Sequence, residues 1–135
     1  MVFVDSNVIL DVITADPRWQ AWSEQQLSHW LERGLLLINP IVYAEIAFAC
    51  EAIEAVDELL PDHLYTYRPI PREAAFLAAR AHADDRARGG SRQTVLADFL
   101  IGAHALVEQV PLLSRDRRRY LQAFPGLELI VPEVE

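Results

Sequence analysis

The sequence contains no lysine, and all twelve of its basic residues are arginines. Phosphohydrolases that form a phosphoaspartate, and receiver-type signalling domains, both need a lysine near the phosphate, so this absence argues against both classes. The phosphohydrolases also need a second aspartate two residues after the nucleophile, and Asn7 stands there relative to Asp5. Guanidinium groups suit bidentate contacts with phosphate, although exclusive use of arginine is equally expected from a GC-rich genome.

Cysteine and long apolar runs are also scarce. The one cysteine, Cys50, permits no internal disulfide and fits a reducing cytoplasm. No apolar segment approaches the ~20 residues that span a bilayer. The start, MVFVDSNVILD, has no basic leader and places an acid inside an apolar run, so we expect a cytoplasmic protein without a membrane segment. There is no cluster of cysteine and histidine and no HExxH motif, which argues against a zinc site.

The excess of acidic residues hides an uneven charge distribution. A net charge of -8 disfavours binding to nucleic acid. Residues 1–67 carry eleven acids against two arginines, whereas residues 68–135 carry ten arginines against nine acids. The second half of the chain is therefore where a phosphate backbone could bind. The apolar fraction of 52% is high for a soluble domain and suggests a further buried surface, such as one that meets a partner.

Short apolar runs alternate with helical segments along these 135 residues, which we interpret as one domain, 1–135. The runs predict strands at 2–4, 35–38, 64–67, 111–113 and 127–131. Helices are predicted after the first strand, over 16–33, after Asn39-Pro40, over roughly 50–60, over 71–90, over 93–109 and after Ser114. This order predicts a three-layer α/β/α sandwich with a central parallel sheet of four or five strands.

Two of the predicted helices contain a single acid in an apolar sequence. Glu45 interrupts IVYAEIAFAC, residues 41–50, and Asp98 interrupts QTVLADFLIGAHALVEQ, residues 93–109. A buried, unpaired carboxylate is costly, so each needs a compensating group. No arginine lies within either apolar stretch. We therefore expect the compensating group to be a metal ion and not a basic side chain.

Two further acids follow predicted strands. Asp5 comes directly after the first strand and Asp116 three residues after the fourth, and sites in parallel sheets lie beyond the carboxyl ends of the strands. All four acids can therefore point into one crevice. Two carboxylates 4 Å apart repel by about 4 kcal/mol at an effective dielectric of 20, so clustered acids take up protons or recruit a cation. Oxygen ligands favour Mg²⁺ or Mn²⁺, and carboxylates with Mg²⁺ and a basic rim are the parts of a phosphodiesterase.

Simpler interpretations exist for several of these residues. Asp5 on its own would be read as a helix cap, and Asp116 as a partner of the helix dipole in a first turn. We expect Ser6, Asn7 and Ser114 to cap helices first and to hydrogen-bond around the acids second.

Two other polar residues are given structural interpretations. Asp11 is expected at the surface. His104, on an apolar helix, is expected to be a hydrogen-bonded imidazole of the core. The remaining histidines have no spacing that suggests metal ligands.

Four segments together resemble a known family: VFVDSNVILD at the start, NPIVYAEI in the middle, LADFLIGAHAL later and LLSRDRRRY…FPGLELIVP at the end. Each motif is weak, but the ordered set resembles a PIN-domain ribonuclease, specifically a VapC-type toxin of a type II toxin-antitoxin system. The resemblance covers the whole chain, and the four acids appear in the order of the family. Ser114 stands where threonine is frequent, which keeps the hydroxyl group.

The resemblance implies a PIN-like fold and an endoribonuclease that uses Mg²⁺ or Mn²⁺ and a water to hydrolyse RNA phosphodiester bonds. It implies tRNA, rRNA or mRNA as substrate, a homodimer, and a cognate antitoxin that docks a helix and directs its tail towards the site. The catalytic and metal-binding residues would be the acidic quartet Asp5, Glu45, Asp98 and Asp116, supported by Ser6, Asn7 and Ser114.

The run RDRRRY places four arginines after the fourth strand. We interpret them as candidate contacts to RNA phosphates, against the alternative of an ordinary solvated surface, and one of them could instead bind an antitoxin carboxylate. These residues are Arg115, Arg117, Arg118 and Arg119. A PIN-like module that binds RNA or a partner with little or no nuclease activity is the competing function.

The helix predicted over 17–33 places Trp19, Trp22 and Trp30 close to one face. Core packing is the default for such a stripe, but we hypothesise that part of this face accepts the antitoxin or a second protomer. The chain purified alone should then self-associate through an exposed apolar surface, which light scattering over a concentration series would detect. A monomer that stays soluble and stable at high concentration would contradict the hypothesis.

Overall fold

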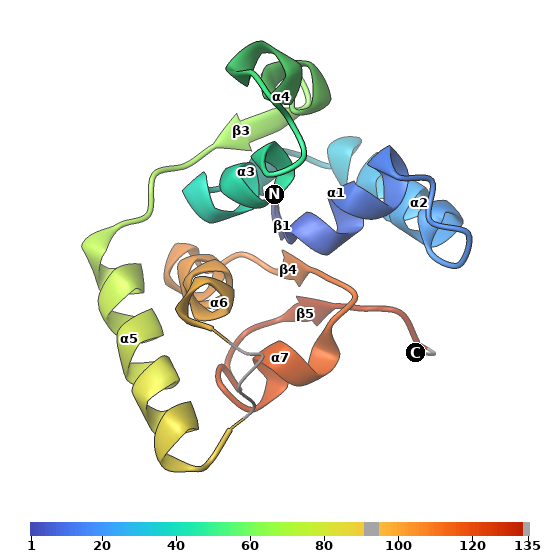
Figure 1. The fold of residues 1–135 in the computed structure, drawn as a ribbon. Helices are drawn as coiled ribbons and strands as arrows, with labels where there is room; N and C mark the ends of the chain where they lie inside the picture. Colours follow the sequence, from blue (N-terminus) through green and yellow to red (C-terminus); the bar gives the residue numbers. More distant parts are fainter. Residues whose placement is uncertain (91–94, 134–135) are drawn as a thin grey trace.

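The structure is a computed structural model that describes residues 1–90 and 95–133. Five strands form one parallel sheet in the order β3-β2-β1-β4-β5 (Figure 1). Each strand falls inside one of the apolar runs that predicted it: β1 (Val2–Val4), β2 (Leu36–Ile38), β3 (Tyr65–Tyr67), β4 (Leu112–Leu113) and β5 (Leu129–Ile130). The predicted parallel sheet is confirmed, with five strands.

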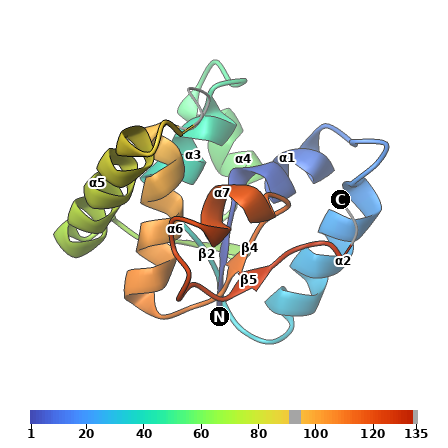
Figure 2. The same cartoon turned by 90° about the horizontal axis from the view of Figure 1, so that it is seen from below.

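Helices cover the sheet on two sides. In Figure 2 the pair α5 and α6 lies on one side of the strands and α2 on the other, which confirms the three-layer α/β/α arrangement. Residues 93 and 94 of the helix predicted over 93–109 lie outside the described residues. The helices are α1 (Ser6–Ile13), α2 (Gln20–Leu31), α3 (Pro40–Ala47), α4 (Ile53–Leu59), α5 (Arg72–Ala87), α6 (Leu96–Glu108) and α7 (Arg117–Leu121).

One of the two pairs of cap and proline opens a helix as the sequence predicts. Asn39 precedes α3, and its side chain accepts hydrogen bonds from the backbone N–H groups of Ile41 and Val42 at 3.0 and 3.1 Å. Asp16 accepts two backbone N–H bonds in the same way, both at 2.9 Å, but it caps a turn, and α2 begins only at Gln20.

The predicted caps at Ser6, Asn7 and Ser114 are wrong. Asp5 occupies the N-cap position of α1 without a side-chain cap bond, and Ser6 is already the first residue of that helix. Asp116, not Ser114, caps α7 by accepting the backbone N–H of Arg119 at 3.1 Å. The side chains of Ser6, Asn7 and Ser114 instead turn towards the carboxyl edge of the sheet, where they hydrogen-bond to acids.

The core lies around β1, the central strand, whose three residues are fully buried. His104 of α6 reaches into this core and is fully buried, as expected. Its Nδ1 lies 3.2 Å from the amide nitrogen of Asn39, and its Nε2 lies 3.4 Å from a carboxylate oxygen of Glu108. Burial lowers the pKa of His104, so the imidazole is held neutral between α3 and α6.

The helix α2 is mostly exposed, and Ser23 is its one buried residue. Trp22 and Trp30 are half-buried against the core, as the default interpretation of the tryptophan stripe expects. Trp19 lies before the helix and meets Trp22 edge to face, with 6.3 Å between ring centroids. None of the helices in the described ranges 1–90 and 95–133 is long and apolar enough to cross a membrane.

Close packing between α6 and α7 depends on Gly102. A Cβ at this position would lie 2.7 Å from Phe124 Cε2 and 2.8 Å from Tyr120 Cδ1. Gly102→Ala should therefore lower the free energy of unfolding by about 1–3 kcal/mol through overpacking, although alanine favours helix by about 1 kcal/mol. Urea denaturation measures the change. Gly126→Ala is the matched control, because its Cβ would meet no atom closer than 3.9 Å and should leave stability unchanged or slightly raised.

Candidate active site

Parallel pairing of β1 with β4 brings the residues that follow each strand together. Asp5 follows β1, Ser114 follows β4, and Ser114 Oγ donates a hydrogen bond to Asp5 Oδ2 at 2.8 Å. Tyr120 Oη donates to the same oxygen at 2.7 Å from α7. All three residues are fully buried. Oδ2 of Asp5 thus accepts two hydroxyl donors, whereas the contact of Oδ1 with Ser6 Oγ is long, at 3.5 Å.

Ser6 and Asn7 connect this carboxylate to its surroundings. Ser6 Oγ donates to Glu45 Oε1 at 3.0 Å, which links the start of α1 to α3. The side-chain amide of Asn7 donates to Ser114 Oγ at 3.3 Å and accepts the backbone N–H of Arg115 at 3.2 Å. The start of α1 is therefore tied to both α3 and the loop after β4.

Glu45 is exposed, and the expectation that it interrupts a buried helix is wrong. The helix α3 buries only Val42 and Ile46, and it leaves Phe48 at the following position 93% exposed. Partial desolvation raises the pKa of Glu45, and the negative charges of Asp5 and Asp98 raise it further. Glu45 is therefore close enough to both Asp5 and Asp98 to be repelled by them.

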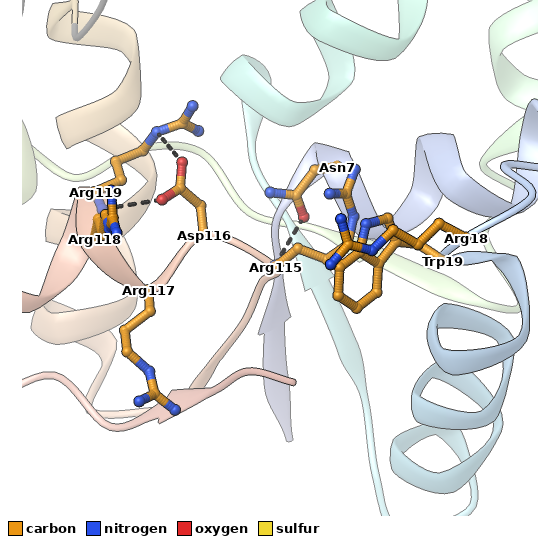
Figure 3. A pocket seen from close by; sticks show the side chains of 8 residues that line it. All are labelled: Asn7, Arg18, Trp19, Arg115, Asp116, Arg117, Arg118 and Arg119. Atoms are coloured by element: carbon orange, nitrogen blue, oxygen red, sulfur yellow. Dashed lines mark hydrogen bonds and ion pairs between the residues drawn. The ribbon is translucent and has the colours of Figure 1, made fainter. Parts of the chain in front are cut away.

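One guanidinium group lies between the carboxylates of Asp98 and Asp116. Asp98 is buried near the start of α6, where its Oδ2 accepts the backbone N–H of Val95 at 2.9 Å. Its Oδ1 lies 3.4 Å from Nη1 of Arg119. The Nε of the same guanidinium lies 3.3 Å from Asp116 Oδ2 (Figure 3).

The expectation that no basic side chain compensates the acids is therefore wrong. Arg119 bridges Asp98 and Asp116, and its positive charge also lowers the pKa of Asp5 and of Glu45. The sequence argument considered only the apolar stretches around Glu45 and Asp98, whereas Arg119 reaches them from α7, a separate element. Tyr120, the next residue, was missed for the same reason.

Burial dominates the electrostatics of the innermost acid. Desolvation raises the pKa of Asp5, and the hydrogen bonds from Tyr120 and Ser114 together with the charge of Arg119 offset only part of this rise. Desolvation and the nearby Asp5 also raise the pKa of Tyr120 well above its ordinary value, so this hydroxyl keeps its proton. Among the described residues, no three acidic, histidine or cysteine side chains stand as a ready-made set of metal ligands.

Asp11 is buried, so the expectation that it lies at the surface is wrong. Its Oδ2 accepts a hydrogen bond from Ser23 Oγ at 2.7 Å and pairs with Nε of Arg115 at 2.6 Å. This contact joins α1, α2 and the loop after β4. Asp11 therefore fixes the side chain of Arg115.

A pocket of about 500 Å³ opens beside the acids. Figure 3 shows Arg118 and Arg119 at one end and Arg18 with Trp19 at the other. Sequence reasoning did not place Arg18 or Trp19 at this pocket: it assigned Trp19 to the core or to a partner-binding face, and Arg18 stood out only as one of two arginines in the acidic half of the chain. The lining residues are Asn7, Arg18, Trp19, Arg115, Asp116, Arg117, Arg118 and Arg119.

Comparison with protein families gives a match to the PIN domain over residues 2–125. The chain belongs to the PIN-domain family. Curated protein sequences give no match. The family suggested by the four sequence motifs is thus confirmed, and the PIN domain fills nearly the whole chain.

Solved structures share the fold of this PIN domain at low sequence identity. One is VapBC2 from Rickettsia felis bound to a DNA fragment from its promoter, with a TM-score of 0.74, 18% identity and coverage of 97% of this chain and 98% of that one. VapBC-1 from nontypeable Haemophilus influenzae gives a TM-score of 0.71 at 19% identity, with coverage of 97% and 98%. DNA-bound VapBC from Salmonella typhimurium gives 0.71 at 16% identity, with 96% of both chains covered.

The raised pKa of Asp5 predicts a pH-dependent stability. The folded protein binds this proton more tightly than the unfolded chain, whose carboxyl has the ordinary pKa of 3.8. The stabilising contribution of the protonated carboxyl is therefore complete below pH 3.8 and is lost as the pH rises through the folded pKa. Asp5→Asn should have a higher free energy of unfolding than the unchanged protein at pH 7, and the difference should shrink towards pH 4, as measured by urea denaturation.

Asp11→Asn is the matched control, since Asp11 is also buried but is paired with Arg115. This variant should lose about 1–3 kcal/mol at pH 7, the scale of a hydrogen bond to a charged group. Equal destabilisation by both substitutions would contradict the assignment of Asp5 as an acid kept at an electrostatic cost.

Proposed function

We propose that this PIN domain is a metal-dependent endoribonuclease of the VapC type, the toxin of a toxin-antitoxin pair. The observation that carries the proposal is the convergence of Asp5 after β1, Glu45 on α3 and Asp98 on α6: Ser6 links Asp5 to Glu45, and, besides partial desolvation, the charges of Asp5 and Asp98 raise the pKa of Glu45. Membership of the PIN family and the fold shared with chains of VapBC complexes support it.

The chemistry of the donor set fits Mg²⁺ or Mn²⁺. Four carboxylates lie at this edge of the sheet, and the hydroxyl donors on Oδ2 of Asp5 leave its Oδ1 for a further partner. Arg119 takes the place of a cation between Asp98 and Asp116. The residues that would hold the metal are Asp5, Glu45, Asp98 and Asp116. A bound Mg²⁺ or Mn²⁺ supplies a water of lowered pKa and neutralises charge on phosphate oxygens.

The protein groups around the acids have distinct tasks in this proposal. Ser114 and Tyr120 hold Asp5 in one orientation, and Ser6 holds Glu45 towards it. Arg119 lines the pocket as well as pairing with Asp98 and Asp116. A guanidinium that leaves these acids is placed to bind a phosphate oxygen of the substrate.

The proposed partners are an RNA substrate (tRNA, rRNA or mRNA), a cognate antitoxin, and a second copy of the chain in a cytoplasmic complex. Exposed apolar side chains support a surface that other chains cover. Phe48 is 93%, Phe76 70% and Ile53 63% exposed, and a partner chain that covers these side chains would remove their apolar surface from water.

A second candidate function is a PIN-like module that binds RNA or a partner with little or no nuclease activity. The contacts of Arg119 favour it, because this guanidinium already neutralises Asp98 and Asp116. The two candidates differ in one respect. A nuclease releases new RNA ends in the presence of a divalent metal, and a binding module does not.

Asp98→Asn should lower metal-dependent cleavage by on the order of 100-fold or more, the scale for removing one electrostatic contributor to a transition state. The fold should persist, because the amide oxygen can still accept the backbone N–H of Val95. The assay incubates the purified chain with total RNA in Mg²⁺, Mn²⁺ or EDTA and maps the cut ends.

Asp84→Asn is the control for this substitution, since Asp84 lies exposed on α5 and pairs only with Arg80 among the described residues. It should cleave as the unchanged protein does. Full cleavage by Asp98→Asn would remove Asp98 from the catalytic set. A folded protein that cuts no RNA with either metal would favour the binding module.

A further inference from the structure

The indole of Trp19 is flanked by two guanidinium groups at one end of the pocket. The Cζ atom of Arg18 lies 4.8 Å from the ring centroid and that of Arg115 lies 5.3 Å from it. Arg18 and Trp19 belong to the turn before α2, whereas Arg115 follows β4. Elements far apart in the sequence therefore build one cationic and aromatic surface (Figure 3).

The two arginines differ in the contacts that hold them. Arg115 is held by buried Asp11 at 2.6 Å, and its backbone N–H is bound by Asn7. Arg18 is exposed, and no carboxylate pairs with it in the described part of the chain. Arg115 is thus a fixed support for the indole, while the long side chain of Arg18 can move to a ligand.

This surface adjoins the acidic cluster. Asn7, which lines the pocket, also donates to Ser114 Oγ, and Ser114 donates to Asp5. Arg118 adds an exposed guanidinium at the other end. The guanidinium of Arg117 points away from Asp116 and from Trp19 in Figure 3, so we assign it no part here.

We propose that Trp19, Arg18, Arg115 and Arg118 form a subsite for one nucleotide of single-stranded RNA next to the bond that is cut. This rests on the proposed function, and it adds Trp19 and Arg18 to the residues expected to meet RNA. A base stacks on the ring surface that Arg18 leaves when it moves to a phosphate, while Arg115 stays in contact with the indole. Arg18 and Arg118 bind the phosphates on either side of that base.

The indole is what favours RNA over an acidic peptide. Guanidinium groups alone would bind a carboxylate as well as a phosphate. A tryptophan ring adds stacking to a nucleobase, which every base can use, but it adds little to the binding of an aspartate or glutamate side chain. Removal of the Trp19 ring should therefore weaken the binding of RNA and leave the binding of an acidic peptide nearly unchanged.

The test measures binding of a fluorescently labelled eight-nucleotide single-stranded RNA by anisotropy in EDTA, where cleavage is not required. Trp19→Leu should weaken binding about tenfold with an unchanged salt dependence, because stacking contributes about 1–3 kcal/mol per base. Trp19→Tyr should keep most of the affinity. Arg18→Ala should weaken binding and reduce the slope of log K against log salt by about 0.7.

Matched controls remove similar groups elsewhere. Phe76→Ala deletes an aromatic ring that is 70% exposed, and Arg72→Ala deletes a guanidinium that is 96% exposed, both on α5. Neither should change RNA affinity beyond twofold. RNA should also quench the tryptophan fluorescence of the unchanged protein and quench it less in Trp19→Tyr, where Trp22 and Trp30 remain, a readout that holds even where Trp19→Leu unfolds.

Three results would overturn the subsite. They are equal RNA affinity of Trp19→Leu and the unchanged protein, quenching as large in Trp19→Tyr as in the unchanged protein, and a Trp19-dependent affinity for an eight-residue glutamate peptide as large as that for RNA. Cleavage of RNA by a protein that gives any of these results would refute the subsite and keep the nuclease. Trp19-dependent binding without cleavage in any metal would keep the subsite and refute the nuclease.

Discussion

The cost of burying carboxylates close to one another at the carboxyl edge of the sheet is the constraint that the surrounding structure meets. Asp5 is fully buried there and accepts hydroxyl donors from Ser114 and Tyr120 on one oxygen. Arg119 crosses from α7 to lie between Asp98 and Asp116. Neither device removes the cost, since the pKa of Asp5 and that of Glu45 stay raised. Raised pKa values of this kind cluster at functional sites, and a divalent cation is the ligand that we propose for this one.

The sheet was predictable because each strand lies in a short, mostly apolar run between helices. A run such as VFV suits the centre of a parallel sheet, where helices cover both faces. The positions of Asp5 and Asp116 followed from the rule that places sites beyond the carboxyl ends of strands. The cap at Asn39 was predictable because its cause is local, within three residues of the chain.

The errors came from contacts between distant elements. Asp11 is buried because Ser23 and Arg115 converge on it from α2 and from the loop after β4, which no local pattern reveals. Glu45 is exposed because α3 packs by one face only, although its sequence is apolar on all sides. Tyr120 and Arg119 sit in a five-residue helix that is too short to show periodicity. Charge compensation inside the fold was therefore underestimated.

The side chain of Asn7 connects the acidic cluster to the cationic and aromatic surface at Trp19. Its amide nitrogen donates to Ser114 Oγ, and its amide oxygen accepts the backbone N–H of Arg115. Because Arg115 is also locked to α1 by Asp11, the distance from the acids to the indole of Trp19 cannot vary freely. An RNA strand that lay across the acids and the indole would need a backbone repeat that matches the distance between them. Under the proposed function, the fold would therefore select RNA by the spacing of groups along its backbone and not by the identity of its bases.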